Sequence, residues 1–213
     1  SLRDFVTSRV ANAAEGQEIA VGELLPTHLS PPNSRRRATL QAVSRGGQPL
    51  IGFREAGSHK IVGLTECHIL SENLFCVVEA LRAILSRRKG KFSVDIELAE
   101  ADQGVDCALK NLAIEGLEQT EAILDFARDN GLARLTLDQG YGPETLWEPE
   151  PVTITLSGVP VGFPSGGFLQ ATCDGEAILT GDAKTWLTGA STVADLFSGL
   201  SAKFTVLEAA SGK

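Results

Sequence analysis

Apolar and polar residues alternate along several stretches of this chain, which is the pattern of β-strands with one buried face. Residues 36–44 alternate in this way, and the glycine pair at 46–47 separates them from a second apolar stretch at 50–54. Two such stretches joined by a glycine turn predict a β-hairpin. A third, short strand is predicted over residues 58–64.

A second group of strands is predicted further along the chain. Residues 92–99 alternate strictly, and a turn at 102–104 joins them to an apolar stretch at 105–112, which predicts another hairpin. Three more strands are predicted over residues 132–137, 152–156 and 159–163, the last two joined by a Ser-Gly turn.

Helical spacing of apolar residues marks four other stretches. The first covers residues 1–15, and the second begins near Ser71, a good N-cap, and ends at the basic run 87–90. The third covers residues 117–129 and is closed by Asn-Gly. A fourth helix, capped by Thr172 or Asp174, is predicted to carry the apolar residues that follow.

These elements predict an α+β fold for the first part of the chain, with an antiparallel, hairpin-rich sheet and a few helices. After residue 170 the pattern changes to a helix, followed by a buried strand at 193–197 and a turn at Gly199. Open α/β sheets build nucleotide pockets from a strand, a glycine turn and a helix. We therefore expect a central α+β domain at 1–170 and the beginning of a Rossmann-like α/β domain at 171–213.

Composition narrows the class of protein. Apolar residues make up 43% of the 213 residues and charged residues 22%, so a packed core is expected rather than disorder. No apolar run approaches the roughly 20 residues of a membrane span. The four cysteines form no Cys-x-x-Cys pair and no export signal is visible, so we expect a reducing, cytoplasmic location.

Charge is distributed unevenly along the chain. Residues 1–60 carry eight bases and five acids, whereas the whole chain has a net charge of −8. An acidic protein of this kind does not coat nucleic acid nonspecifically. A local basic face that meets phosphates is still compatible with this charge, and the run of arginines at 35–37 is the candidate for it.

Three blocks of sequence, in this order, resemble the uracil-5 RNA methyltransferases that act on tRNA or ribosomal RNA. The first is Arg35-Arg36-Arg37-Ala38-Thr39-Leu40. The second joins Ile51-Gly52-Phe53-Arg54, Ser58, Ile61-Val62 and Cys67-His68-Ile69-Leu70. The third is Phe168-Leu169-Gln170 with Asp195-Leu196-Phe197-Ser198-Gly199. The resemblance covers the central domain of the family and the opening of its catalytic domain.

The resemblance implies an S-adenosylmethionine-dependent enzyme that methylates C5 of a uridine in rRNA or tRNA. By resemblance, Gln170, Phe197 and Gly199 would contact the cofactor. The nucleophilic cysteine of the family lies beyond the position of Lys213, so no catalytic residue is assigned here. We expect this chain to be a fragment of such an enzyme and to be inactive in isolation.

An iron–sulfur cluster is a further feature of many members of this family. Three of its cysteines precede the central domain, and the fourth corresponds to Cys67. A cubane cluster needs four cysteine ligands, so with Cys67 alone we expect no cluster in this chain. A cluster in the full-length parent protein is compatible with this expectation.

The same resemblance makes the arginines candidates for RNA contact. Arg36, Arg37 and Arg54 lie on predicted neighbouring strands and would offer guanidinium groups to phosphates. Strand alternation places Arg35 and Arg37 on one face and Arg36 on the other, so at least one is a candidate for a structural ion pair. The expected partner is rRNA or tRNA, with no DNA or membrane partner.

Two alternatives remain open at this point. One is a non-catalytic RNA-binding or scaffold module that uses the central domain by itself. The other is an unrelated α+β domain with no RNA role, which internal ion pairing of the arginines would favour.

Overall fold

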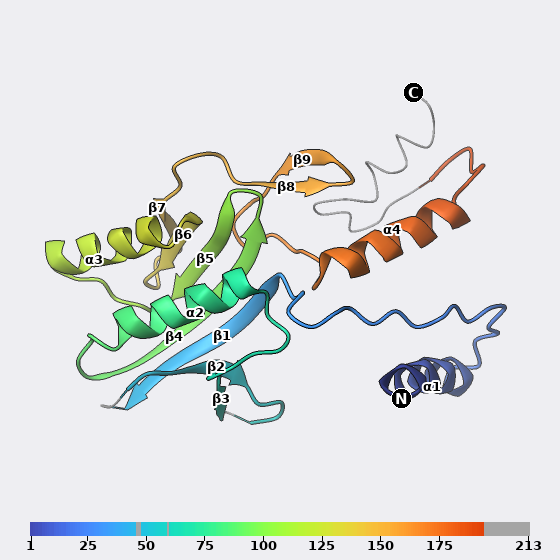
Figure 1. Cartoon of the computed structure of the whole chain (residues 1–213), viewed down its shortest axis with the longest axis horizontal. Coiled ribbons are helices and arrows are strands. Elements are labelled where there is room, and N and C mark those ends of the chain that lie inside the picture. The colour runs from blue at the N-terminus through green and yellow to red at the C-terminus, as the bar shows by residue number, and fades with distance from the viewer. Residues whose placement is uncertain (46–47, 59, 194–213) are drawn as a thin grey trace. The chain divides into compact units, whose positions relative to one another are not determined.

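The computed structural model describes residues 1–193 except 46–47 and 59. The chain forms two compact units, Ser1–Pro31 and Pro32–Lys213 (Figure 1). The predicted strand at 193–197 and Gly199 lie outside the described residues, apart from Val193. No helix in the described part of the chain is long and apolar enough to cross a membrane.

The first unit consists of helix α1 (Leu2–Gly16) and an extended segment after it. Ser1 caps the helix in a capping box. Its hydroxyl accepts a hydrogen bond from the backbone N–H of Asp4, and the Asp4 carboxylate accepts one from the backbone nitrogen of Ser1. The helix predicted over residues 1–15 is therefore confirmed. None of its residues is buried, and its apolar positions stay largely exposed, Phe5 by 58%.

The second unit is built on a seven-stranded sheet with the order β3-β2-β1-β4-β5-β6-β7. Its strands are β1 (Arg37–Arg45), β2 (Leu50–Arg54), β3 (Ile61–Gly63), β4 (Lys91–Ala101), β5 (Gly104–Lys110), β6 (Leu132–Asp138) and β7 (Pro143–Trp147). The hairpins predicted from alternation are present, with Gln41 paired to Gly52 and Leu98 paired to Cys107.

One pairing differs from the expected hairpins. Strands β5 and β6 run parallel, with Cys107 opposite Leu135, and helix α3 (Gly116–Asp129) makes the crossover between them. A crossover helix is what a parallel pair requires. Helix α3 buries Ile123, Phe126 and Ala127 on its inner side, whereas Leu124 is only half-buried.

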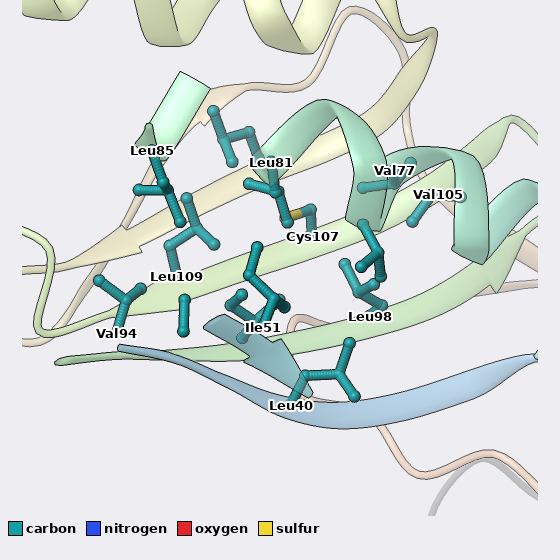
Figure 2. Packing of buried hydrophobic residues seen from close by; sticks show 14 of the residues in the cluster. Leu40, Ile51, Val77, Leu81, Leu85, Val94, Leu98, Val105, Cys107 and Leu109 are labelled. Carbon is teal, nitrogen blue, oxygen red and sulfur yellow. The ribbon is translucent and has the colours of Figure 1, made fainter. Parts of the chain in front are cut away.

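The main core lies between one face of the sheet and two helices, α2 (Glu72–Leu85) and α3. Ser71 caps α2 as predicted, with its hydroxyl accepting the backbone N–H of Leu74. Figure 2 shows the apolar residues of α2 packed onto those of the central strands. The labelled residues there are Leu40, Ile51, Val77, Leu81, Leu85, Val94, Leu98, Val105, Cys107 and Leu109.

A smaller core covers part of the opposite face of the sheet. It is formed by the hairpin of β8 (Thr153–Leu156) and β9 (Val159–Gly162) with Phe163 and Leu169, packed against Ala133, Ala99 and Ala101. Because Ala99 alternates with Leu98 along β4, this cluster and the main core lie on different faces. The hairpin after residue 152 is thus confirmed, and it brings the segment that follows it to the sheet.

Helix α4 (Cys173–Trp186) follows this segment. Thr172 caps it, with its hydroxyl accepting the backbone N–H of Gly175 at 3.1 Å, which is one of the two caps predicted. None of the residues of α4 is buried. Polar contacts link its first turn to the beginning of β1, since the Arg36 guanidinium contacts Cys173 and Glu176.

Candidate nucleic-acid interface

The arginine run at the start of β1 is the point where three segments meet. The backbone N–H of Arg35 donates to the Ile69 carbonyl, and the Arg35 carbonyl accepts from Ser71, the cap of α2, each at 2.9 Å. The N–H of Arg36 donates to the Ala171 carbonyl at 2.9 Å, just before α4. These backbone hydrogen bonds hold the arginine run in place, and the position of its backbone limits which residues the three guanidinium groups can contact.

Arg36 is turned toward the first turn of α4 and is 6% exposed. Its Nε donates to the Gln170 carbonyl at 3.1 Å, its Nη1 lies 3.3 Å from the Cys173 thiol sulfur, and its Nη2 forms an ion pair with the Glu176 carboxylate. A buried guanidinium needs such partners, because an unpaired buried charge is strongly unfavourable. Arg36 is thus the structural arginine that strand alternation allowed for, and its contacts are internal.

Arg37 lies on the other face, as alternation predicts. Its guanidinium carbon is 4.5 Å from the centroid of the Phe168 ring, a cation–π distance. Phe168 itself is 62% exposed, so the ring offers a flat apolar face to solvent. Nε of Arg37 is buried and has no hydrogen-bond partner among the described residues. Sequence reasoning assigned Arg37 to RNA but did not assign Phe168.

A surface pocket of about 370 Å³ adjoins this stack. Arg35 and Arg37 line it together with two acids, Glu97 and Asp106. Each acid has a cationic partner of its own: Lys110 Nζ lies 2.6 Å from the Glu97 carboxylate, and Arg134 contacts Asp106. The two arginines form no ion pair with a described residue, so the pocket carries a net positive charge.

The Asp106–Arg134 pair was not anticipated from the sequence. Arg134 Nε and Nη2 reach the two carboxylate oxygens of Asp106 at 3.0 and 2.6 Å, and Nη1 donates to the Phe163 carbonyl at 3.0 Å. Hydrogen bonding to Asp106 raises the pKa of Arg134 above its ordinary value, against the opposing effect of burial. The sequence signal for this pair was a single charged residue in the interior of each apolar strand, Asp106 in β5 and Arg134 in β6. The pair holds the segment before Phe168 onto the sheet.

Arg54 is exposed at the end of β2. Gln41 of β1 is paired with Gly52 in an antiparallel register, so Arg54 comes to the end of the sheet where β1 begins. Directly paired residues of neighbouring strands share a face. Arg54 therefore lies on the same face and at the same end of the sheet as Arg37.

The predicted cofactor residues are only partly within the described chain. Gln170 is half-buried, and its carbonyl accepts the Arg36 contact. It lines neither the pocket beside Arg37 nor a second pocket of about 460 Å³ beside Arg36. Phe197 and Gly199 lie outside the described residues. The assignment of Gln170, Phe197 and Gly199 to the cofactor therefore stays a prediction.

The four cysteines differ in exposure. Cys67, the predicted cluster ligand, is half-buried and its sulfur accepts the backbone N–H of Leu70 at 3.3 Å. The described part of the chain contains no group of three or more His, Cys, Asp or Glu residues that could hold a metal ion. Cys107 is fully buried, and burial raises the pKa of its thiol. Cys76 and Cys173 are exposed and line the second pocket.

Comparison with known proteins identifies relatives of this chain. An uncharacterized RNA methyltransferase of Zymomonas mobilis is 46% identical over 199 residues, which are 93% of this chain and 50% of that protein. An uncharacterized RNA methyltransferase of Brucella suis is 31% identical over 90% of the chain and 45% of its own length. Both of these relatives are named as RNA methyltransferases.

A further relative carries a more specific name. The 23S rRNA (uracil(1939)-C(5))-methyltransferase RlmD of Tolumonas auensis is 30% identical over 80% of this chain and 40% of that protein. The chain spans about half the length, or less, of the curated relatives it matches. No protein-family model matches it.

Proposed function

We propose that this chain is the RNA-contacting part of an S-adenosylmethionine-dependent methyltransferase that methylates C5 of a uridine in ribosomal RNA. Two findings support the proposal: the names of the relatives, one of them a 23S rRNA uracil-C5 methyltransferase, and the order of the three sequence blocks. The observation that carries the RNA contact is the Arg37 guanidinium stacked on the exposed ring of Phe168.

The chemistry of this face suits a single-stranded or unpaired stretch of RNA. Aromatic rings stack on unpaired bases, and guanidinium groups bind phosphates or stack beside the same bases. Arg37 and Arg54 supply positive charge at one end of the sheet, and the neighbouring acids Glu97 and Asp106 are neutralised by their own partners. An RNA strand would therefore meet a cationic surface on a protein whose net charge is −8.

The cofactor enters the proposal through the relatives rather than through the described residues. S-adenosylmethionine supplies the methyl group in this class of enzyme. Gln170 is the one predicted contact in the described part of the chain, and its half-buried position beside the start of α4 leaves its amide as a candidate for the amino-acid end of the cofactor. The RNA contact is the part of the activity to which the described residues contribute directly.

A binding experiment tests the RNA contact. Fluorescence anisotropy with a labelled 23S rRNA fragment measures the affinity of the wild type, Arg37→Ala, Arg54→Ala and Phe168→Ala. Loss of base stacking at Phe168 is expected to cost about 1–3 kcal/mol, and loss of each arginine is expected to lower the salt dependence by about one phosphate contact. Trp186→Ala, which removes another exposed aromatic ring from α4, is the matched control. Unchanged affinity in all three variants would reject this face as the RNA contact.

A second measurement separates an enzyme from a scaffold. Isothermal titration with S-adenosylmethionine, and transfer of a labelled methyl group to rRNA, are carried out on a protein with the length of the relatives. Binding and transfer that depend on Phe168 and Arg37 support the methyltransferase. RNA binding without either cofactor binding or transfer would favour the non-catalytic RNA-binding module.

A further inference from the structure

A second basic region lies at the opposite end of the sheet from Arg37. Residues 80–94 contain five bases and no acid, in a chain whose net charge is −8. Arg87, Lys89 and Lys91 are exposed and form no ion pair with a described residue. Helix α2 ends at Leu85, and the attraction of cations to a helix C-terminus fades beyond its last turn. The helix therefore does not account for Lys89 and Lys91.

Arg88, in the same basic run, differs from these three residues because its guanidinium group makes hydrogen bonds within the protein. Its Nη2 donates to the Ala113 carbonyl at 2.7 Å and its Nη1 to the Gln119 side-chain oxygen at 3.1 Å. These contacts attach the basic loop to the segment that leads into α3. Arg87 and Lys89 thus lie in a loop that Arg88 anchors, and Lys91 follows it as the first residue of β4.

Tyr141 is fully exposed in the loop between β6 and β7. It stands between Gly140 and Gly142, which adopt φ values of 102° and 103°. The backbone N–H groups of both glycines donate to the same oxygen of the Asp138 carboxylate, at 2.7 and 3.2 Å. These hydrogen bonds hold the loop in a conformation that exposes the Tyr141 ring to solvent. An exposed aromatic ring does not stabilise the fold.

The two loops flank one segment of the chain. Arg88 contacts Ala113, and the backbone N–H of the next residue, Ile114, donates to the Gln139 side chain at 3.0 Å. Lys91 begins β4, whereas Arg37 is paired with Ala99 of the same strand. Eight residues of β-strand separate these positions, about 26 Å. The basic loop and Tyr141 therefore form a surface separate from the Arg37–Phe168 stack.

We propose that this surface, composed of Arg87, Lys89, Lys91 and Tyr141, is a second RNA-binding site that holds another unpaired stretch of the same RNA. The inference rests on the proposed function, since it takes RNA as the partner. Cations next to a flat exposed ring are the combination that binds single-stranded nucleic acid, with phosphates on the cations and a base on the ring. Two contact sites about 26 Å apart would fix the direction in which the RNA crosses the sheet.

The test uses the complete chain and a fluorescein-labelled single-stranded oligouridylate, with the affinity measured between about 50 and 200 mM salt. Arg87→Ala/Lys89→Ala/Lys91→Ala is expected to lower the slope of log affinity against log salt by about 2, at about 0.7 for each phosphate contact on a single strand. Arg3→Ala/Arg9→Ala/Lys184→Ala removes the same charge from other exposed positions and is expected to leave the slope nearly unchanged.

Tyr141→Ala is expected to weaken binding about tenfold, which is within the range for loss of one base stack. Trp186→Ala on α4 is the matched aromatic control and should bind like the wild type. Ultraviolet cross-linking followed by mass spectrometry should place RNA adducts on the peptide that contains Tyr141.

The outcomes separate this inference from the proposed function. Equal losses in the two triple variants, or a Tyr141→Ala variant with wild-type affinity and no adduct, would overturn the second site. If Arg37→Ala and Phe168→Ala still weaken binding in that case, the proposed RNA contact stands alone. A wild type that binds no RNA at all would overturn both.

Discussion

The buried Asp106–Arg134 pair allows a quantitative test of what holds the loop segment before Phe168 onto the sheet. The two side chains are only 7% and 6% exposed, and Arg134 also donates to the Phe163 carbonyl. Asp106→Asn removes the carboxylate and leaves the guanidinium buried, with Glu148 as the nearest acid at 3.9 Å. Breaking one side of a buried pair costs about 3–5 kcal/mol. That is a large part of the roughly 5–15 kcal/mol by which a domain is stable.

A matched control lies on the same sheet face. Glu97 and Lys110 also form an ion pair between neighbouring strands, but their side chains are 37% and 42% exposed. An exposed pair contributes about 0–1 kcal/mol, so Glu97→Gln should lower the free energy of unfolding by no more than that. Both changes turn a carboxylate into an amide of the same size. The difference between their losses in the free energy of unfolding therefore measures the effect of burying the ion pair.

Urea denaturation measures both variants. Trp147 reports on the sheet by fluorescence, since its indole N–H donates to the Leu132 carbonyl at 2.9 Å on the strand that carries Arg134. Trp186→Phe in the background removes the signal of the exposed tryptophan. If Asp106→Asn loses less than about 1 kcal/mol, as expected for an exposed pair, the reasoning from burial is refuted. The double variant Asp106→Leu/Arg134→Met should lose less than Asp106→Asn, because no charge remains buried.

Three further changes test other parts of the structure. Gly167→Ala places a Cβ 2.6 Å from the buried Phe163 ring and should cost about 1–3 kcal/mol in urea denaturation, whereas Gly162→Ala, with open space around it, should cost less. Arg36→Ala removes the side-chain contacts to α4, so hydrogen exchange should become faster in α4 than in the sheet strands. Cys107 has a thiol pKa raised from its ordinary 9.0, so its contribution to stability is present below that value and is lost as pH rises. Between about pH 8 and pH 10 the wild type should lose about 1.4 kcal/mol more than Cys107→Ala in urea denaturation, and an equal loss would contradict this burial effect.

Most of the elements were predictable because their sequence signals are local. Alternation predicted the strands at 36–44 and 92–99, and Ser71 and Thr172 marked the beginnings of α2 and α4. The parallel pairing of β5 and β6 was missed because an apolar strand reads the same in either direction. Strand β7, at Pro143–Trp147, was also missed because its first three residues are exposed and give no periodic signal.

The candidate site was predictable only in part. Alternation correctly separated Arg36 from Arg37, since it depends on backbone geometry alone. The stacking of Arg37 on Phe168 joins residues far apart in the chain, and it depends on the β8–β9 hairpin and the Asp106–Arg134 pair that bring the later segment back to the sheet. No local pattern carries that information. Whether the arginines contact RNA stays a prediction.

The two faces of the arginine run determine how a mutation there should be interpreted. Arg37 contacts the Phe168 ring from one side, while Arg36 holds the Gln170 carbonyl and Glu176 from the other. Loss of Arg36 would therefore displace the segment around Phe168 and weaken RNA binding without any phosphate contact of its own. If Arg36→Ala weakens RNA binding and also makes hydrogen exchange in α4 faster, the loss of affinity comes from displacement of the segment around Phe168. If Arg37→Ala weakens RNA binding at unchanged stability, the loss comes from a direct contact between Arg37 and the RNA. Only the second pattern would assign an arginine to the RNA.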